Sequence, residues 1–527
     1  MTTDESFRWD VPATFNFSAD VIDHWAADPD RLALITVDGT GTDQHFSYAD
    51  IATASARLAN LLAERGLRQG DRLIVMLPRI AEWQIAMVAA TRMGAVPIPC
   101  ITMLTVSDLA YRVEHSGAVG VICVTDDCTK FDGMDDLSVR IAVGDAPDGW
   151  TSIADTAGYS SDFTPATVGV EDPAILYYTS GSTGPPKGVT HAARSLWAWS
   201  NSAVHWLGLS PDARIWCTAD TGWSKAGTSI LFGPWSQGAS VLFHDGPFVP
   251  AERFALLERF EVTCFCAAAT ELRRLILEDT SGFDLSKLRS TVSAGESVNP
   301  EVIDRWREIS GTTVLDGYGQ TETLMTVTNR PGRPVKPGSM GRPLPGVEVA
   351  VRTIDEATGD EAAEAHGAGE LMIRLPNPQL MIGYWDDADR TEASILTIGG
   401  AQWFATGDNV DIDDEGYVFY TGRADDIIGS AGYRIGPQEV ENALLRHPAV
   451  QECAVVGVPD DERGEIVKAW VVLAAGHVGD DDLVEALQTH TKQTTAPYKY
   501  PRAISFTDDL PKTVTGKIRR NVLRTKG

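Results

Sequence analysis

Positive charge is scarce in this chain. Its 527 residues include 44 lysines and arginines against 73 aspartates and glutamates, which gives a formal net charge of −29. A surface of this kind repels nucleic-acid backbones and anionic membranes over most of its area. We therefore expect neither nucleic acid nor a membrane as a partner, and an anionic ligand would need a local patch of lysine or arginine.

Long apolar runs and paired cysteines are also missing. No uninterrupted apolar stretch approaches the ~18 residues of a membrane span, and the opening MTTDESFRWD has no basic and apolar leader. These absences predict a cytoplasmic protein. The seven cysteines are an odd number without a Cys-x-x-Cys pair, so we expect reduced, mostly buried thiols and no structural metal. Cys264 and Cys266 alternate and should share one face of a core strand.

What the sequence does contain is regular alternation. Over residues 46–332, helix-period stretches alternate with short β-rich runs, which is the pattern of an α/β fold. Glycine, proline and short strands then predict a β-rich subdomain up to about residue 420. The remaining residues alternate strands with a helix over about 481–491 and predict a small α+β domain. A chain of this length exceeds one compact core, so at least two domains are expected.

The most informative segment is YYTSGSTGPPKGVTH, residues 177–191. Glycines, which let backbone amides converge on an anion, are mixed with hydroxyl side chains around Lys187, and this predicts a triphosphate cradle. A Walker loop is excluded, because Gly188 and Val189 follow the lysine where that loop requires serine or threonine. A flexible linker is the alternative. It is disfavoured because an apolar, strand-like run precedes the segment and a helix-like stretch over about 192–206 follows it.

Three predicted strands end in residues that suit a shared site. Thr179, Gly295 and Asp316 each lie at the end of a β-rich run. In α/β sheets, ligands bind outside the carboxyl ends of the strands. These positions therefore predict one crevice built from segments that are far apart in the sequence.

Six motifs follow one another along the chain. They are TSGSTGPPKG, SAGES (293–297), DGYGQTET (316–323), TGD (406–408), GRADD (422–426) and PKTVTGK (511–517). Together they resemble the adenylate-forming acyl-CoA synthetase superfamily over nearly the whole chain. Within it, the segments that look most like the medium-chain branch are FNFSADVIDHWA, MLPRIAEW, TADTGW, GYRIGPQEVENAL and LPKTVTGKIRR.

The resemblance implies a reaction with ATP, Mg²⁺ and coenzyme A. A medium-chain acid and MgATP would give an acyl-adenylate and pyrophosphate, and coenzyme A would then capture the acyl group and release AMP. It also implies a large N-terminal domain of α/β layers with the β-rich subdomain, residues 1–423, and a small mobile α+β domain, residues 424–527. The hinge would lie near Asp425. The expected partners are a small-molecule carboxylic acid, ATP and coenzyme A, and the sequence leaves a homo-oligomer open.

By the same resemblance, most motif residues would surround the nucleotide. Those matched to ATP or AMP binding are Thr179, Ser180, Gly181, Ser182, Thr183, Gly184, Lys187, Gly295, Glu296, Ser297, Asp316, Gly317, Tyr318, Gly319, Gln320, Thr321, Asp408, Arg423 and Lys517. Tyr318 would offer its ring to adenine, although a tyrosine of the core is the common alternative. Asp408 would accept hydrogen bonds from the ribose hydroxyls, with Arg423 beside it.

Four residues are matched to the chemistry itself, namely Thr179, Lys187, Glu322 and Lys517. Attack of a carboxylate on the α-phosphate brings two anions together, so cations must offset their repulsion. Lys187 would hold the β- and γ-phosphates, and Glu322 would bind Mg²⁺. Lys517, in a turn near the C-terminus, would insert its charge between the acid and the α-phosphate.

The thiol step has its own segment. Ser430, Gly432, Tyr433 and Arg434 are matched to coenzyme A binding, with the glycine leaving room for the pantetheine arm. The neighbours at positions 429 and 431 are smaller or less polar than is usual in the family. The general scheme is expected to hold, while these two positions leave the individual contacts to coenzyme A open.

The acyl pocket is matched to Trp223, Gly295 and Gly319. A core tryptophan explains Trp223 equally well. In acetate-specific relatives the position of Gly319 carries tryptophan, so glycine should open space for several methylenes, each worth ~0.8 kcal/mol when buried. This favours a medium-chain acid over acetate but also admits an aromatic acid.

Three alternatives stay open at this point. The first is an aryl-CoA ligase that acts on benzoate-like acids by the same mechanism. The second is a stand-alone adenylation protein that loads the phosphopantetheine thiol of a carrier protein. The third is a non-catalytic nucleotide-binding regulator, which the intact set of Lys187, Glu322, Asp408 and Lys517 disfavours.

Overall fold

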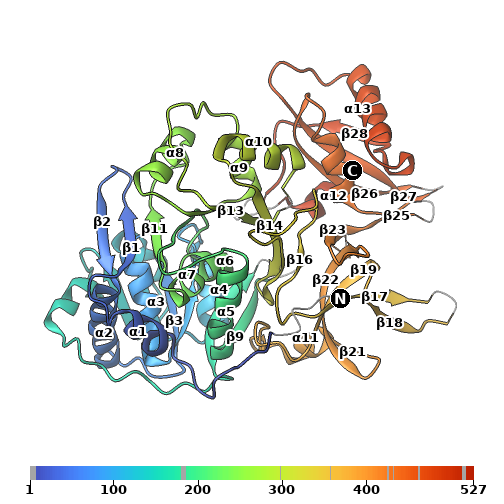
Figure 1. Ribbon diagram of the computed structural model, residues 1–527. Helices are drawn as coiled ribbons and strands as arrows, with labels where there is room; N and C mark the ends of the chain where they lie inside the picture. The colour runs from blue at the N-terminus through green and yellow to red at the C-terminus, as the bar shows by residue number, and fades with distance from the viewer. Residues whose placement is uncertain are drawn as a thin grey trace.

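The computed structural model describes residues 7–179, 185–296, 298–355, 358–423, 426–430, 433–460, 463–512 and 518–526. In these ranges the strands form five sheets, and helices pack against them (Figure 1). The N-terminal half contains the α/β layers, and sheets with antiparallel pairs dominate the C-terminal half. The predicted α/β class with a β-rich part and a small C-terminal α+β part is confirmed.

A nine-stranded sheet forms the centre of the molecule, in the order β16-β15-β14-β13-β12-β10-β11-β1-β2. Its strands are β1 (Leu32–Val37), β2 (Asp43–Ser47), β10 (Arg214–Cys217), β11 (Ser240–His244), β12 (Cys264–Cys266), β13 (Ser290–Ala294), β14 (Val314–Gln320), β15 (Leu324–Thr328) and β16 (Arg342–Pro343). From β1 to β14 all neighbours are parallel. The carboxyl ends of six strands therefore share one edge, where α/β sheets bind ligands.

Two smaller sheets complete the N-terminal half. The parallel sheet β4-β3-β5-β6-β7 and the antiparallel sheet β20-β9-β8 contain β3 (Arg72–Met76), β4 (Val96–Pro99), β5 (Gly120–Val124), β6 (Val139–Val143), β7 (Thr151–Ser152), β8 (Pro173–Thr179), β9 (Lys187–Ala192) and β20 (Gly383–Tyr384). Strand β9 was not predicted. It lies between the cradle and helix α5 (Ala193–His205). Its sequence indicates a strand only weakly, and backbone pairing with β8 and β20 stabilises it.

The C-terminal half consists of two further sheets. The β-rich part contains β17 (Val349–Ile354), β18 (Glu361–Glu364), β19 (Gly367–Arg374), β21 (Ile395–Ile398), β22 (Ala401–Ile412) and β23 (Val418–Arg423). The last sheet contains β24 (Ile428–Ser430), β25 (Tyr433–Ile435), β26 (Val450–Asp460), β27 (Gly464–Leu473) and β28 (Ala503–Phe506), with helices α12 (Pro437–Leu444), α13 (Asp481–Thr494) and α14 (Arg520–Thr525). Between β23 and β24 the chain passes from one sheet to the other.

Local signals set the ends of several helices. In α2 (Tyr48–Glu64), Ser47 and Asp50 form a reciprocal capping box. The other helices are α1 (Asp23–Trp25), α3 (Ala81–Met93), α4 (Val106–Ser116), α6 (Ser224–Ser229), α7 (Phe232–Ser236), α8 (Pro250–Arg259), α9 (Ala269–Leu275), α10 (Pro300–Ser310) and α11 (Ala388–Ala393). No helix in the ranges given above is long and apolar enough to cross a membrane.

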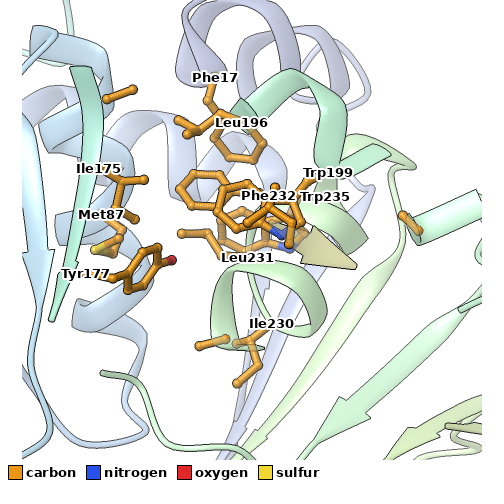
Figure 2. Packing of buried hydrophobic residues seen from close by; sticks show 14 of the residues in the cluster. Phe17, Met87, Ile175, Tyr177, Leu196, Trp199, Ile230, Leu231, Phe232 and Trp235 are labelled. Carbon is orange, nitrogen blue, oxygen red and sulfur yellow. The ribbon is translucent and has the colours of Figure 1, made fainter. Parts of the chain in front are cut away.

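An aromatic core supports the helices next to the central sheet. Figure 2 shows Trp199 and Phe232 packed against each other, and their ring centroids are 4.8 Å apart. Trp199 also donates from Nε1 to Thr228 Oγ1 at 2.8 Å, which ties α5 to α6. Burying side chains of this size contributes about 1.5–3 kcal/mol each, so this core fixes α6 against the sheet edge.

The cysteines lie where the sequence predicted. All seven are free and buried. Cys264 and Cys266 lie on β12 and belong to the same hydrophobic cluster, whereas Phe265 between them packs on the other side of the strand. The predicted alternation is confirmed.

Candidate active site

The cradle segment is mounted on a hairpin. Thr179 ends β8, Lys187 begins β9, and the two residues are partners in the antiparallel register. This pairing brings the predicted phosphate lysine beside the predicted first residue of the cradle. Residues 180–184, which include Ser180, Gly181, Ser182, Thr183 and Gly184, lie outside the described ranges.

A tyrosine connects the predicted phosphate lysine with the predicted metal carboxylate. Tyr384 lies on β20 beside β9, and its hydroxyl donates to Glu322 Oε1 at 3.1 Å. Lys187 Nζ lies 5.5 Å from the centroid of the same ring, a cation–π distance. Burial and the nearby Glu322 raise the pKa of Tyr384, which keeps its hydroxyl protonated as a donor.

Glu322 is held by its backbone as well as by Tyr384. Its carbonyl accepts from the Met381 amide at 2.8 Å. In the described part of the chain no group of three or more histidine, cysteine, aspartate or glutamate side chains could hold a metal ion. A lone carboxylate fits Mg²⁺, because this ion keeps water and phosphate oxygens as most of its ligands.

The loop that carries Glu322 is fixed by a buried histidine. His191 Nε2 lies 2.6 Å from the carbonyl oxygen of Thr321, and because a carbonyl only accepts, Nε2 carries the proton. Burial lowers the pKa of His191 to about 4, so the ring is neutral near pH 7. Thr321 Oγ1 lies 3.3 Å from Ser224 Oγ on α6, so Thr321 faces the start of that helix.

The predicted ribose carboxylate lies against strand β14, which ends at Gln320, just before Thr321 and Glu322. Asp408, on β22 and 5% exposed, accepts from the Tyr318 hydroxyl at 2.7 Å and from Gln320 Nε2 at 2.6 Å. Arg423 Nη1 is 3.9 Å from its other oxygen. The structure thus connects Asp408 with the strand that continues into Thr321 and Glu322, and it uses the Tyr318 hydroxyl to orient the carboxylate.

The end of β13 forms the adjacent wall. Gly295 has φ of +97°, and a Cβ built there would meet nothing within 4 Å, so open space lies beside it. The neighbouring Glu296 pairs with Arg273 at 3.5 Å. On β14, Asp316 accepts from the Gly317 amide at 2.9 Å, and burial raises the pKa of Asp316 to about 7. Ser297 lies outside the described ranges.

The backbone of a neighbouring strand crowds Gly319. A Cβ at this position would collide with the Leu324 carbonyl oxygen and lie 2.7 Å from the Leu324 carbonyl carbon. The cause is an irregular register between Tyr318 and Gly319, with Leu324 at φ of +54°. The neighbouring strand β15 therefore leaves no room for a side chain at position 319 on this backbone. That a glycine here opens the acyl pocket to longer acids stays a prediction.

The predicted coenzyme A segment lies in the C-terminal sheet. Ser430 is buried at the end of β24 and pairs with Tyr433 on β25. The Tyr433 ring is exposed and stacks on Tyr498, with centroids 4.3 Å apart. Gly432, the predicted hinge residue Asp425, Lys517 and the side chain of Arg434 lie outside what the structure describes.

Comparison with known proteins identifies the family. The model of the AMP-binding enzyme family matches residues 22–385, and that of the AMP-binding enzyme C-terminal domain matches residues 439–517. The chain belongs to the AMP-binding enzyme family. The mouse protein named acyl-coenzyme A synthetase ACSM3, mitochondrial, is 39% identical, and the match covers 99% of this chain and 92% of that protein.

Two further relatives extend this result. The Bacillus subtilis protein named uncharacterized acyl-CoA ligase YtcI is 39% identical over 98% of this chain and 97% of its own length. The crystal structure of the anthranilate CoA ligase AuaEII with anthranoyl-AMP is 29% identical, superposes with a TM-score of 0.87, and covers 98% of each chain. The predicted adenylate-forming acyl-CoA ligase, which uses ATP and coenzyme A, is therefore confirmed.

Two residues of this AMP-binding enzyme escaped the sequence analysis. Tyr384 is 62 residues away from Glu322, and no motif marks it. His191 closes the cradle segment, but it is a single histidine and its strand, KGVTHA, carries no pattern that marks it. Their contacts follow from the tertiary structure, in which β20, β9 and β8 are neighbours in one sheet.

We predict that Tyr384→Phe weakens MgATP use without unfolding the protein. The substitution removes one hydrogen bond to a carboxylate and keeps the ring under Lys187, so kcat/KM for MgATP should fall about tenfold, the size of one charge-assisted bond. Steady-state kinetics at varied Mg²⁺ will measure it, with Tyr417→Phe as the control because Tyr417 donates to the Pro334 carbonyl instead. An unchanged Mg²⁺ dependence would contradict the assignment.

Proposed function

We propose that this enzyme converts a medium-chain carboxylic acid to its acyl-CoA, with ATP, Mg²⁺ and coenzyme A, through an acyl-adenylate. The observation that carries the proposal is that three predicted site residues lie close together. Lys187 and Glu322 both contact Tyr384, and Asp408 accepts from Gln320 at the end of β14, two residues before Glu322. The choice of a medium-chain acid rests on the five segments that look like the medium-chain branch.

The first half-reaction would use these groups to bring two anions together. Thr179 and Lys187, with the cradle residues between them, would hold the β- and γ-phosphates, and Thr321 would contact the α-phosphate. Asp408 would hold the ribose, and Glu322 would hold Mg²⁺, which supplies positive charge to the phosphates when bound. Fixing both reactants in this way lowers the entropic cost of the attack.

The second half-reaction would need a rearrangement of the C-terminal domain. We propose that residues 424–527 rotate about Asp425 relative to residues 1–423. Lys517 would serve adenylation in one orientation, and the segment from Ser430 to Arg434 would serve thioester formation in the other. Trp223 would line the acyl and pantetheine side of the site.

The test is a panel of acids with free coenzyme A as the only thiol. Octanoate should release pyrophosphate and AMP and form octanoyl-CoA in the absence of any carrier protein. Benzoate is the discriminating comparison, because one of the structural neighbours is a benzoate CoA ligase, 30% identical with a TM-score of 0.83. A clear preference for benzoate would replace the medium-chain assignment, and no thioester with free coenzyme A would point to a carrier protein.

A further inference from the structure

A lysine lies at the sheet edge beside the predicted acyl site, and the reaction outlined above leaves it without a role. Lys225 is the second residue of α6 and follows Trp223 and Ser224. Ser224 contacts Thr321, as described above, so this turn of α6 borders the place where the acid would react. Lys225 is half-buried, whereas the next four residues of α6 are buried.

The amine of Lys225 borders open space. Its Nζ donates to the Ala294 carbonyl at 3.1 Å. The next residue is Gly295, beside which a Cβ would meet nothing within 4 Å. The ammonium thus lies at the end of β13, next to the residue that borders this open space.

The surroundings keep this amine charged. Cys217 on β10 and Cys266 on β12 are register partners beneath it. Burial lowers the pKa of Lys225, but Cys266, Cys217, Glu296 and Glu271 together outweigh burial, and the pKa is raised. An ammonium has three N–H donors, and the hydrogen bond to Ala294 uses one of them.

A plain alkyl chain is a poor neighbour for such a group. Within the described ranges no carboxylate lies within 4.0 Å of the Lys225 amine, since none of the ion pairs found there includes it. Packing hydrocarbon against a charged amine removes water from it without supplying an acceptor, which is unfavourable. An oxygen on the substrate would supply that acceptor.

We propose that Lys225 binds a second oxygen function on the chain of the acid, so that the preferred substrate is a hydroxy, oxo or dicarboxylic acid of medium length. This inference rests on the proposed function and specifies its substrate class. The reacting carboxylate would lie near Thr321, and the second oxygen would lie near the amine at the far wall. The aromatic edge of Trp223 would pack on the methylenes between them.

The first experiment uses the wild-type enzyme. Pyrophosphate release is measured with octanoate and with eight-carbon acids that carry one added oxygen function: 4-oxo-, 6-oxo- and 8-hydroxyoctanoate, and suberate. At least one of these should exceed octanoate in kcat/KM by about tenfold or more, because sites built around a polar group discriminate strongly against analogues that lack it. Octanoate faster than every oxygenated acid would overturn the proposal.

The second experiment assigns the preference to Lys225. Lys225→Met keeps the length of the side chain and removes the charge, so it should lower kcat/KM for the preferred oxygenated acid at least about tenfold and leave or raise that for octanoate. The control Lys287→Met removes the same charge from an exposed lysine paired with Glu261 at 3.5 Å. It should leave kcat/KM unchanged for both the oxygenated acid and octanoate. An equal loss on all acids would overturn the proposal, because Lys225 would then serve the reacting carboxylate or the fold.

A third variant separates the oxygen functions. Lys225→Gln keeps a hydrogen-bond donor without charge, so a preference for a hydroxy or oxo acid should largely persist and a preference for suberate should be lost. Failure of the proposed function can be told apart from failure of the role of Lys225. If the proposed function is wrong, the wild-type enzyme forms no acyl-CoA from any acid. If only the role of Lys225 is wrong, the wild-type enzyme forms acyl-CoA but does not prefer an oxygenated acid to octanoate.

Discussion

Asp408→Asn is expected to lower acyl-adenylate formation about 10²–10³-fold while the protein stays folded. The Asp408 carboxylate accepts from the Tyr318 hydroxyl and from Gln320 Nε2, both on β14. Both donors reach the same oxygen, Oδ2, so an asparagine can keep these two bonds with its amide oxygen and puts its NH₂ group where Oδ1 lies 3.9 Å from Arg423 Nη1. The negative charge is lost, and hydrogen bonds to a charged acceptor are the stronger ones, about 1.5–3 kcal/mol each. The proposed bonds to the ribose hydroxyls would be lost as well.

The measurement is exchange of labelled pyrophosphate into ATP in the presence of the acid, which reports the first half-reaction alone. Asp411→Asn is the matched control, since Asp411 is an exposed aspartate on the same strand β22. The melting temperature should fall by only a few degrees in Asp408→Asn. Exchange at the wild-type rate would show that Asp408 is a structural acceptor for Tyr318 and Gln320 without a part in nucleotide binding.

Gly319→Ala is expected to abolish activity and to destabilise the protein by roughly 3 kcal/mol or more, at the upper end of overpacking effects. The added Cβ would overlap the Leu324 carbonyl oxygen and lie 2.9 Å from Met325 Cα. Both obstacles are backbone, so no side-chain rotation relieves the clash. The strands β14 and β15 would have to separate, and Gln320, Thr321 and Glu322 would move with them.

Thermal unfolding and pyrophosphate exchange on the same preparation will check this prediction. Gly282→Ala is the control, because Gly282 is exposed, lies in a turn, and has nothing within 4 Å of an added Cβ. Gly319→Trp, which copies the residue of acetate-specific relatives, should give an unstable protein and not an acetate-selective one. An active, stable Gly319→Trp enzyme with a shorter acid range would support the pocket role predicted from the sequence.

The sequence by itself determined the class of fold and the identity of the main polar groups. Periodic apolar residues indicate strands and helices because each element must bury one face, and a capping box such as that of Ser47 and Asp50 needs only neighbouring residues. The cradle around Lys187 and the motifs containing Glu322 and Asp408 are short continuous strings whose chemistry can be recognised without a structure. The burial of the cysteines follows from composition and spacing in the same way.

Only the tertiary structure decided what these groups contact. Tyr384 meets Glu322 because β20 pairs with β9, His191 meets Thr321 across 130 residues, and Lys225 reaches Ala294 across 69. The crowding at Gly319 depends on the conformation of a neighbouring strand. Such contacts follow from strand order and register, which depend on the burial of many distant side chains at once, and no local pattern of residues encodes them.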